Sequence, residues 1–122
     1  NNRTVAMRIP HSDEKNVRIE HRIAGADANP YLVTAAVLAG ILHGLDSKGD
    51  PGPAIVGNAY EQTEQRQLFW RDTINDFMAS GFIKDMFGAE FQHVYGQQKL
   101  KEMRSFYTEV TTLEYDWYLR SV

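Results

Sequence analysis

The sequence predicts an α+β fold, with a two-stranded antiparallel hairpin over about residues 2–23 and four or five helices over about residues 29–120. Three observations support this prediction. β-Branched apolar residues near the N-terminus are spaced as in short strands. A long apolar run then begins at an Asn-Pro pair, which is typical of a helix start. Further amphipathic segments with helical spacing follow that run.

The hairpin is predicted as two strands over residues 2–9 and 17–23, joined by the polar segment 11–16. Both strands contain β-branched apolar residues, which favour an extended backbone. These residues are Val5, Ile9, Val17, Ile19 and Ile23. Arg3 and Arg8 are five positions apart and would lie on opposite faces of an ideal strand. Either a bulge therefore lies between them or Arg3 precedes the strand.

The first helix is predicted to have Asn29 as its N-cap and Pro30 at its first position, and to run to about Leu45. This segment is apolar on nearly all sides, which is typical of a helix that is buried on most of them. Gly40 in its interior costs about 1 kcal/mol relative to Ala. We therefore expect another backbone to approach closely there. The polar segment that follows, about residues 47–65, is rich in Gly and Pro and predicts a surface loop.

Four more helical segments are predicted in the rest of the chain. They cover about residues 70–79, 82–87, 89–109 and 112–119. Most of their aromatic residues are expected to pack in the core, with some available for a subunit interface, because such patterns belong more often to packing than to ligand cages. The last segment begins at a capping-box pattern, with Thr111 three positions before Glu114.

The composition excludes several classes of function. The chain has 122 residues, a net charge of −3 and no cysteine. The absence of cysteine excludes disulfide scaffolds, thiolate metal sites and cysteine nucleophiles. The negative net charge does not favour nucleic-acid binding, and the apolar run over residues 31–45 is too short to span a membrane. Because the chain begins abruptly at Asn1, we expect it to be a piece of a longer protein.

A cluster of charged residues in the hairpin is the main candidate for function. Arg18, Glu20 and Arg22 share one face of the predicted second strand, because side chains alternate along a strand. Three more cations are close in the sequence, namely Arg3, Arg8 and Lys15. So many cations repel one another unless an anion binds, and guanidinium groups bind phosphate oxygens in a bidentate manner. The cluster therefore predicts phosphate chemistry.

The position of Glu20 has two interpretations. It could bind a divalent metal, because Mg²⁺ takes few protein carboxylates and leaves positions open for phosphate oxygens and water. It could instead be an ordinary surface carboxylate paired with Arg18 and Arg22, and such pairs are common and weak. Even as a ligand, a single carboxylate would form only part of a metal site. His21, on the opposite face of the strand, is expected to be structural.

Four motifs, in this order, resemble the C-terminal part of the glutamine synthetase catalytic domain. They are Asn2-Arg3-Thr4, Arg8-Ile9-Pro10, Arg18-Ile19-Glu20-His21-Arg22 and Ala26-Asp27-Ala28-Asn29-Pro30-Tyr31. The resemblance covers essentially the whole chain. Within the family, the chain is most similar to the bacterial γ-glutamylputrescine synthetases, on His21-Arg22-Ile23 and on residues 25–31, 39–46 and 91–95.

The resemblance implies a role for each basic residue of the cluster. Arg3 would contact both the transferred phosphate and the glutamate substrate. Arg22 would hold the glutamate close to its reacting carboxylate, so Arg3 and Arg22 are the catalytic candidates. Arg8, Lys15 and Arg18 would join Arg3 in binding the phosphates of ATP.

The resemblance also implies a metal and a reaction. Glu20 would bind the Mg²⁺ or Mn²⁺ that bridges the ATP phosphates. ATP would phosphorylate the γ-carboxylate of glutamate, and an amine would then attack the acyl phosphate. The amine would be putrescine or another polyamine. It would be ammonia if the longer protein that contains this chain, here called the parent, is an ordinary glutamine synthetase. The 122-residue chain alone would be inactive, because the remaining ligands would lie upstream.

The wider setting follows from the same resemblance. The parent would be a large homo-oligomeric ring in the cytoplasm, with ATP, glutamate and an amine as partners and with no nucleic-acid or membrane partner. A non-catalytic structural relative is a further alternative. The charge cluster argues against it, because a purely structural role does not require those residues.

Overall fold

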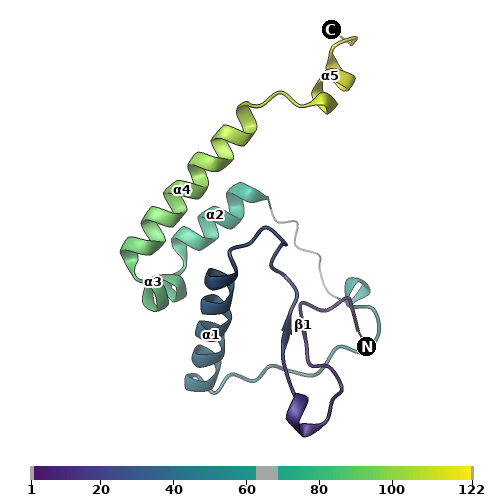
Figure 1. Cartoon of the computed structure of the whole chain (residues 1–122), viewed down its shortest axis with the longest axis vertical. Coiled ribbons are helices and arrows are strands. Elements are labelled where there is room, and N and C mark those ends of the chain that lie inside the picture. The colour runs from purple at the N-terminus through teal and green to yellow at the C-terminus, as the bar shows by residue number, and fades with distance from the viewer. Residues whose placement is uncertain (1, 63–68, 122) are drawn as a thin grey trace. The chain divides into compact units, whose positions relative to one another are not determined.

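The computed structural model describes residues 2–62 and 69–121, and the chain divides into two compact units, Asn1–Arg66 and Gln67–Val122 (Figure 1). The first unit contains the hairpin and one long helix, and the second contains only helices. This arrangement confirms the α+β prediction and the order of its elements. Within the described residues, no helix is long and apolar enough to cross a membrane.

The hairpin of the first unit is confirmed, but its strands are much shorter than predicted. Strand β1 is Met7–Arg8 and strand β2 is Glu20–His21, and a 3₁₀ turn, η1 (Glu14–Asn16), lies in their connection. The strands pair antiparallel, with Met7 opposite His21 and Arg8 opposite Glu20. Strand propensity extends a ladder only where a partner lies alongside, so the predicted strands over 2–9 and 17–23 were too long.

Helix α1 (Pro30–Asp46) begins where the sequence predicts. The Asn29 side chain accepts hydrogen bonds from the N–H groups of Tyr31 and Leu32, at 3.0 and 3.2 Å. These two bonds satisfy donors that have no partner inside the helix, which is the physical basis of the N-cap preference. The loop after α1 carries a second 3₁₀ turn, η2 (Ala59–Glu61), before the described residues of this unit end.

The prediction that α1 is buried on most sides is wrong for this chain. Among its described residues only Ala39 is buried, whereas Leu42 is 56% exposed and Leu45 is 70% exposed. The close approach expected at Gly40 is also wrong, because no atom outside the neighbouring backbone of its own helix lies within 4 Å of where its Cβ would be. The apolar pattern identified faces suited to burial, but the first unit has too few elements to cover all of them.

The second unit is built around the longest helix. It contains α2 (Trp70–Ala79), α3 (Gly81–Phe87), α4 (Ala89–Thr108) and α5 (Thr112–Tyr118). Helices α2 and α3 pack on α4, and the most buried side chains at this contact are Ile74 and Met103. Gln92 is also buried, and its Nε2 donates to the carbonyl groups of Phe77 and Ser80, each at 2.8 Å. This amide joins the end of α2 to α4.

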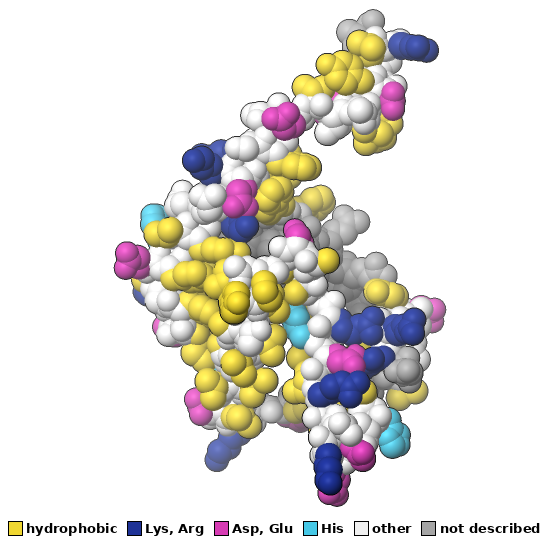
Figure 2. Space-filling view, in the orientation of Figure 1, with side chains coloured by type: hydrophobic (Ala, Val, Ile, Leu, Met, Phe, Trp, Pro, Cys, Tyr) yellow, Lys and Arg dark blue, Asp and Glu magenta, His cyan; other side chains and the backbone are white. Residues whose placement is uncertain are grey.

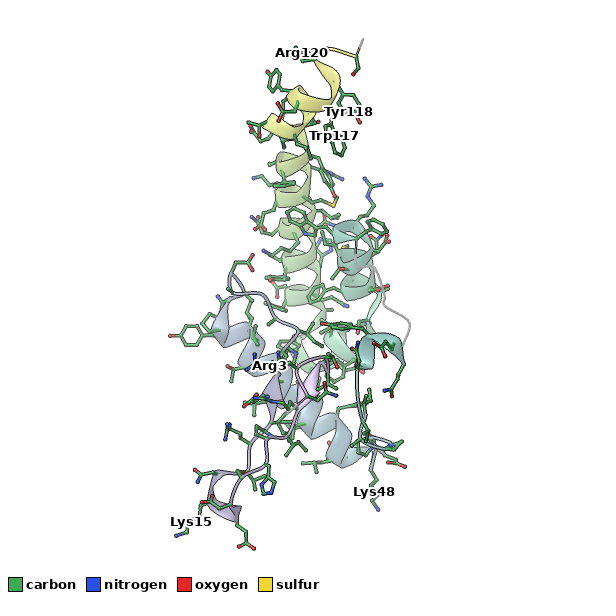
Figure 3. All side chains as sticks on the ribbon, turned by 90° about the vertical axis from the view of Figure 1, so that its right-hand side faces the viewer. Arg3, Lys15, Lys48, Trp117, Tyr118 and Arg120 are labelled. Carbon is green, nitrogen blue, oxygen red and sulfur yellow. The ribbon has the colours of Figure 1, made fainter. Side chains whose placement is uncertain are left out.

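The predicted core packing of the aromatic residues is confirmed only in part: rings of α2 and α4 contact one another, but Phe106 of α4 is itself 59% exposed. The rings of Trp70 and Phe106 lie 5.7 Å apart, and those of Phe77 and Tyr95 lie 5.4 Å apart. In contrast, Trp117 and Tyr118 are 62% and 58% exposed and project from α5 (Figure 3). The capping box of α5 is present as predicted, with reciprocal hydrogen bonds between Thr111 and Glu114. Helix formation at α5 is thus specified locally, while burial of its aromatics is not.

Gly96 of α4 lies against the Met78 side chain of α2. A Cβ at this position would lie 2.6 Å from Cγ of Met78, well inside contact distance. We expect Gly96→Ala to destabilise the chain by about 1–2 kcal/mol, because overpacking outweighs the gain in helix propensity. Gly40→Ala is the matched control, since open space surrounds that position, and it should stabilise the chain by about 0.5–1 kcal/mol.

Urea unfolding of both variants, followed by circular dichroism, measures these two free energies. Equal shifts of the unfolding midpoint in the same direction would contradict the close contact at Gly96.

Candidate functional site

The charged cluster lies on one face of the β1–β2 hairpin and is centred on Glu20. The Nε of Arg8 donates to Oε2 of Glu20 at 2.8 Å, and its Nη2 lies 2.5 Å from the same oxygen. The Nη2 of Arg18 donates to the other oxygen, Oε1, at 3.2 Å. Both carboxylate oxygens therefore accept hydrogen bonds from guanidinium groups. In Figure 2, basic side chains gather around an acidic one on this part of the molecule.

The strand register explains why these three side chains meet. Arg8 and Glu20 are direct cross-strand partners, so their side chains lie opposite each other on the same face of the hairpin. Arg18 lies two positions before Glu20 and shares that face, as the sequence predicts. The second arginine that contacts Glu20 is Arg8, on the other strand. The sequence pattern predicts Arg22, which lies two positions after Glu20, as that partner. Pairing across strands could not be read from spacing within one strand.

The hydrogen bond from Arg8 is the main cause that holds the pKa of Glu20 below its ordinary value of 4.5. Partial desolvation opposes this effect, and the charges of Arg8 and Arg18 add to it. A lowered pKa means that the folded state favours the carboxylate over the acid. The pair therefore contributes to folding above pH 4.5, and this contribution is lost as the pH falls through the lowered pKa.

The other predicted site residues lie around this centre to different degrees. Arg22 follows β2 directly, and its N–H donates to the carbonyl of Ala6 at 2.9 Å, which continues the ladder by one bond. Its side chain is exposed. Arg3 is exposed and precedes β1, which confirms the second of the two arrangements that the Arg3–Arg8 spacing allowed. Lys15 lies in η1 at the far end of the hairpin loop, away from Arg3 (Figure 3).

The opposite face of the hairpin has a different character. Met7 and His21 line an open cavity of about 410 Å³ together with apolar residues of α1. The helix residues are Val33, Ala36, Val37, Gly40 and Ile41. The cavity lining is mostly apolar and holds no carboxylate or guanidinium group, so charged substrates suit the Glu20 face and not this one. His21 therefore lies apart from the charge cluster, as strand alternation predicts.

Two residues of this region carried no signal of their own in the sequence. Asn2 and Thr4 flank Arg3, and each makes a hydrogen bond to the segment at residues 57–59. The spacing of residues within one strand says nothing about contacts between residues that are 55 positions apart. In the sequence, Asn2 and Thr4 are marked only as members of the Asn2-Arg3-Thr4 motif.

The donor set fits a metal only as a shared site. Within residues 2–62 and 69–121, no group of three or more His, Cys, Asp or Glu side chains could hold a metal ion. Glu20 supplies one carboxylate, and its side chain is 27% exposed. Mg²⁺ commonly uses one or two protein carboxylates and fills its remaining positions with phosphate oxygens and water. Glu20 beside two guanidinium groups fits such a metal if phosphate oxygens and water fill the remaining positions.

Comparison with known proteins places these motifs in one family. The family model for the glutamine synthetase catalytic domain matches residues 1–118. The chain is 43% identical to gamma-glutamylputrescine synthetase PuuA of Escherichia coli, covering 99% of this chain and 26% of that protein. It is 35% identical to a glutamate–isopropylamine ligase of a Pseudomonas species, covering 97% of this chain and 27% of that protein.

The chain is also similar to a relative whose name specifies glutamine as the product. The chain is 29% identical to a glutamine synthetase of Halobacterium salinarum, covering 97% of this chain and 28% of that protein. No solved structure matches the chain. The chain spans about a quarter of the length of these curated relatives. The match over residues 1–118 and the 43% identity show that this chain belongs to the glutamine synthetase family.

Proposed function

We propose that this chain forms part of an ATP-dependent ligase that joins the γ-carboxylate of glutamate to an amine through a γ-glutamyl phosphate. The observation that carries the proposal is the Arg8–Glu20–Arg18 arrangement, in which one ionised carboxylate is held by two guanidinium groups on a single face. Family membership supports the reaction class, since the similar proteins are named as synthetases and ligases.

The reaction makes a demand that this cluster can meet. ATP and the γ-carboxylate of glutamate are both anions, and the first step must bring them together. Guanidinium groups offset this repulsion and stabilise the charge that develops on the transferred phosphoryl oxygens. We assign phosphate binding to Arg3, Arg8, Lys15 and Arg18. Arg3 also faces glutamate in this proposal.

Arg22 is proposed to hold the glutamate near its reacting carboxylate. Its backbone is fixed to the ladder by the bond to Ala6, while its side chain is exposed and can reach a ligand. A fixed backbone with an open guanidinium is suited to recognition of a carboxylate, because the planar fork matches two carboxylate oxygens.

Glu20 is proposed to bind the divalent metal, Mg²⁺ or Mn²⁺. When bound, the metal would neutralise charge on the ATP phosphates. Arg8 and Arg18 keep Glu20 ionised and oriented before the metal and nucleotide arrive. A carboxylate in its charged form is the form that a hard cation requires.

The chain is proposed to act within a longer polypeptide in a homo-oligomeric ring. It spans about a quarter of its curated relatives, and it provides one carboxylate where a complete metal site needs more ligands. The exposed apolar residues of α1 support the same view, because they require a covering layer that the described residues of the first unit do not provide. ATP and glutamate are metabolites of the cytoplasm, and we place the enzyme there.

Putrescine or another polyamine is the proposed amine, on the strength of the similarity to the putrescine-named relative. Ammonia is the second candidate, because a glutamine synthetase is also among the similar proteins. A non-catalytic structural relative is the least favoured alternative. A purely structural protein would not need so many arginines in one cluster.

An assay of the full-length enzyme that contains this chain distinguishes a polyamine from ammonia as the amine, and a ligase from a non-catalytic relative. Phosphate release would be measured with ATP, glutamate and Mg²⁺, in the presence of ammonia, ethanolamine, isopropylamine, putrescine or spermidine. We expect the highest kcat/KM with putrescine or another polyamine, and no turnover without ATP. A preference for ammonia would reject the polyamine assignment and keep the ligase class. No turnover with any amine would reject the ligase class.

A further inference from the structure

We propose that Asn2 and Thr4 are positioning residues, which hold the backbone of Arg3 against an anchor formed by residues 56–62. This inference rests on the role proposed above for Arg3. It concerns neither a metal nor a substrate contact, but the means by which one arginine outside the strand ladder keeps a defined place. Figure 1 shows the N-terminal segment beside the segment that carries η2.

The two residues form a continuous hydrogen-bonded junction. The Nδ2 of Asn2 donates to the carbonyl of Gly57 at 2.8 Å. The Ala59 N–H donates to Oγ1 of Thr4 at 2.8 Å, and that hydroxyl donates in turn to Oδ1 of Asn2 at 2.6 Å. The Thr4 N–H donates to the same Asn2 oxygen at 3.0 Å. The Thr4 hydroxyl is thus used both as donor and as acceptor.

The other side of the junction is itself well held. Ala59 is only 5% exposed. Asn58 caps η2, since its Oδ1 accepts from the Tyr60 N–H at 3.1 Å. The Nε2 of Gln62 donates to the carbonyl of Val56 at 2.7 Å, which closes the segment on itself. Gly57 allows this compact path, because its φ of 87° is rarely adopted by other residues. The segment can therefore serve as a fixed reference.

Arg3 needs such a reference because the sheet does not provide one. β1 begins only at Met7, and residues 3–6 form a bent segment. Asn2 and Thr4 are half-buried on either side of the exposed Arg3. Two anchored neighbours fix where the Arg3 backbone lies and leave its side chain open to a ligand. In catalysis, displacement of a reacting contact by about 1 Å can reduce the rate by about 100-fold.

The test removes the Thr4 hydroxyl in the full-length enzyme and measures turnover. Thr4→Val keeps the shape of the side chain but removes the link to Ala59, and we expect kcat to fall by about 10- to 100-fold. Thr4→Ser retains the hydroxyl and should restore most of the turnover. The matched control is Thr34→Val, because the Thr34 hydroxyl donates to the Pro30 carbonyl of the same helix at 2.8 Å. This control should keep wild-type kcat.

Two further measurements separate positioning from a general loss of stability. Hydrogen exchange of a peptide that contains residues 57–62 should become faster in Thr4→Val and not in Thr34→Val. In an Arg3→Ala background, Thr4→Val should cause no further fall in kcat, because a residue that acts through Arg3 has nothing left to position. An equal fall in both backgrounds, or unchanged exchange, would overturn the inference.

Failure of the inference is distinguishable from failure of the proposed function. If Arg3→Ala turns over like the wild type, Arg3 has no catalytic role and the site assignment fails. If Arg3→Ala is strongly impaired while Thr4→Val keeps wild-type kcat, the role of Arg3 stands and only the positioning inference is rejected.

Discussion

Replacing Glu20 with Gln is expected to reduce the metal-dependent turnover of the full-length enzyme by about two to three orders of magnitude. The amide retains the size of the side chain but lacks the charge that a divalent cation requires. It also cannot balance the guanidinium groups of Arg8 and Arg18, which both contact the carboxylate. Turnover would be measured over a range of Mg²⁺ and Mn²⁺ concentrations. We expect the apparent metal affinity to fall along with the rate.

Folding should change far less than turnover in this variant, because the ion pairs of Glu20 are still partly exposed to solvent, which screens their contribution to stability. Glu102→Gln provides the matched control. Glu102 also accepts a hydrogen bond from a basic partner, with Lys99 Nζ at 2.7 Å, and its pKa is likewise lowered, mainly by that bond. Wild-type turnover of Glu20→Gln at low Mg²⁺ would refute the ligand role. A similar loss in both variants would point to a general effect of removing an ion pair.

Replacing Arg22 with Lys is expected to lower kcat/KM by about 100-fold even though the charge is kept. Lys presents a compact point charge, while the planar guanidinium can engage two oxygens of the glutamate carboxylate at once. The ladder bond from the Arg22 N–H to the Ala6 carbonyl does not involve the side chain, so the hairpin should persist. Steady-state kinetics with varied glutamate would show the loss as a raised KM, a lowered kcat or both.

Arg104→Lys, on the exposed surface of α4, is the control for the same chemical change. It should have wild-type kinetics. Within the described residues, Arg22 forms no ion pair with Glu20, so a loss of turnover could not be attributed to a broken pair. An unchanged rate in Arg22→Lys would instead show that Arg22 does not recognise a carboxylate through its fork.

The elements that the sequence predicted best are those with local causes. The N-cap of α1 at Asn29 and the capping box of α5 involve groups within three positions of each other, so a short stretch of sequence contains the whole interaction. Strand lengths were predicted poorly, because a ladder needs a partner at every position. Burial of α1 was predicted wrongly for a related reason: an apolar face indicates what should be covered, and not what covers it.

The candidate site shows the same division. Alternation along one strand correctly placed Arg18 and Glu20 on a common face and His21 on the other. The stronger partner of Glu20 is Arg8, twelve positions away, and that pairing depends on the register of two strands. The link from Thr4 to Ala59 spans 55 positions and has no repeating pattern in the sequence.

By itself, the sequence determined the order of the elements, the helix starts, the family and the inventory of charged residues, because each of these depends on residue type and on short-range spacing. Only the tertiary structure decided which arginine pairs with Glu20, which apolar faces stay exposed, and what holds Arg3. Those outcomes depend on contacts between distant parts of the chain, and such contacts form only when the entropy of closing long loops is repaid by the groups that meet.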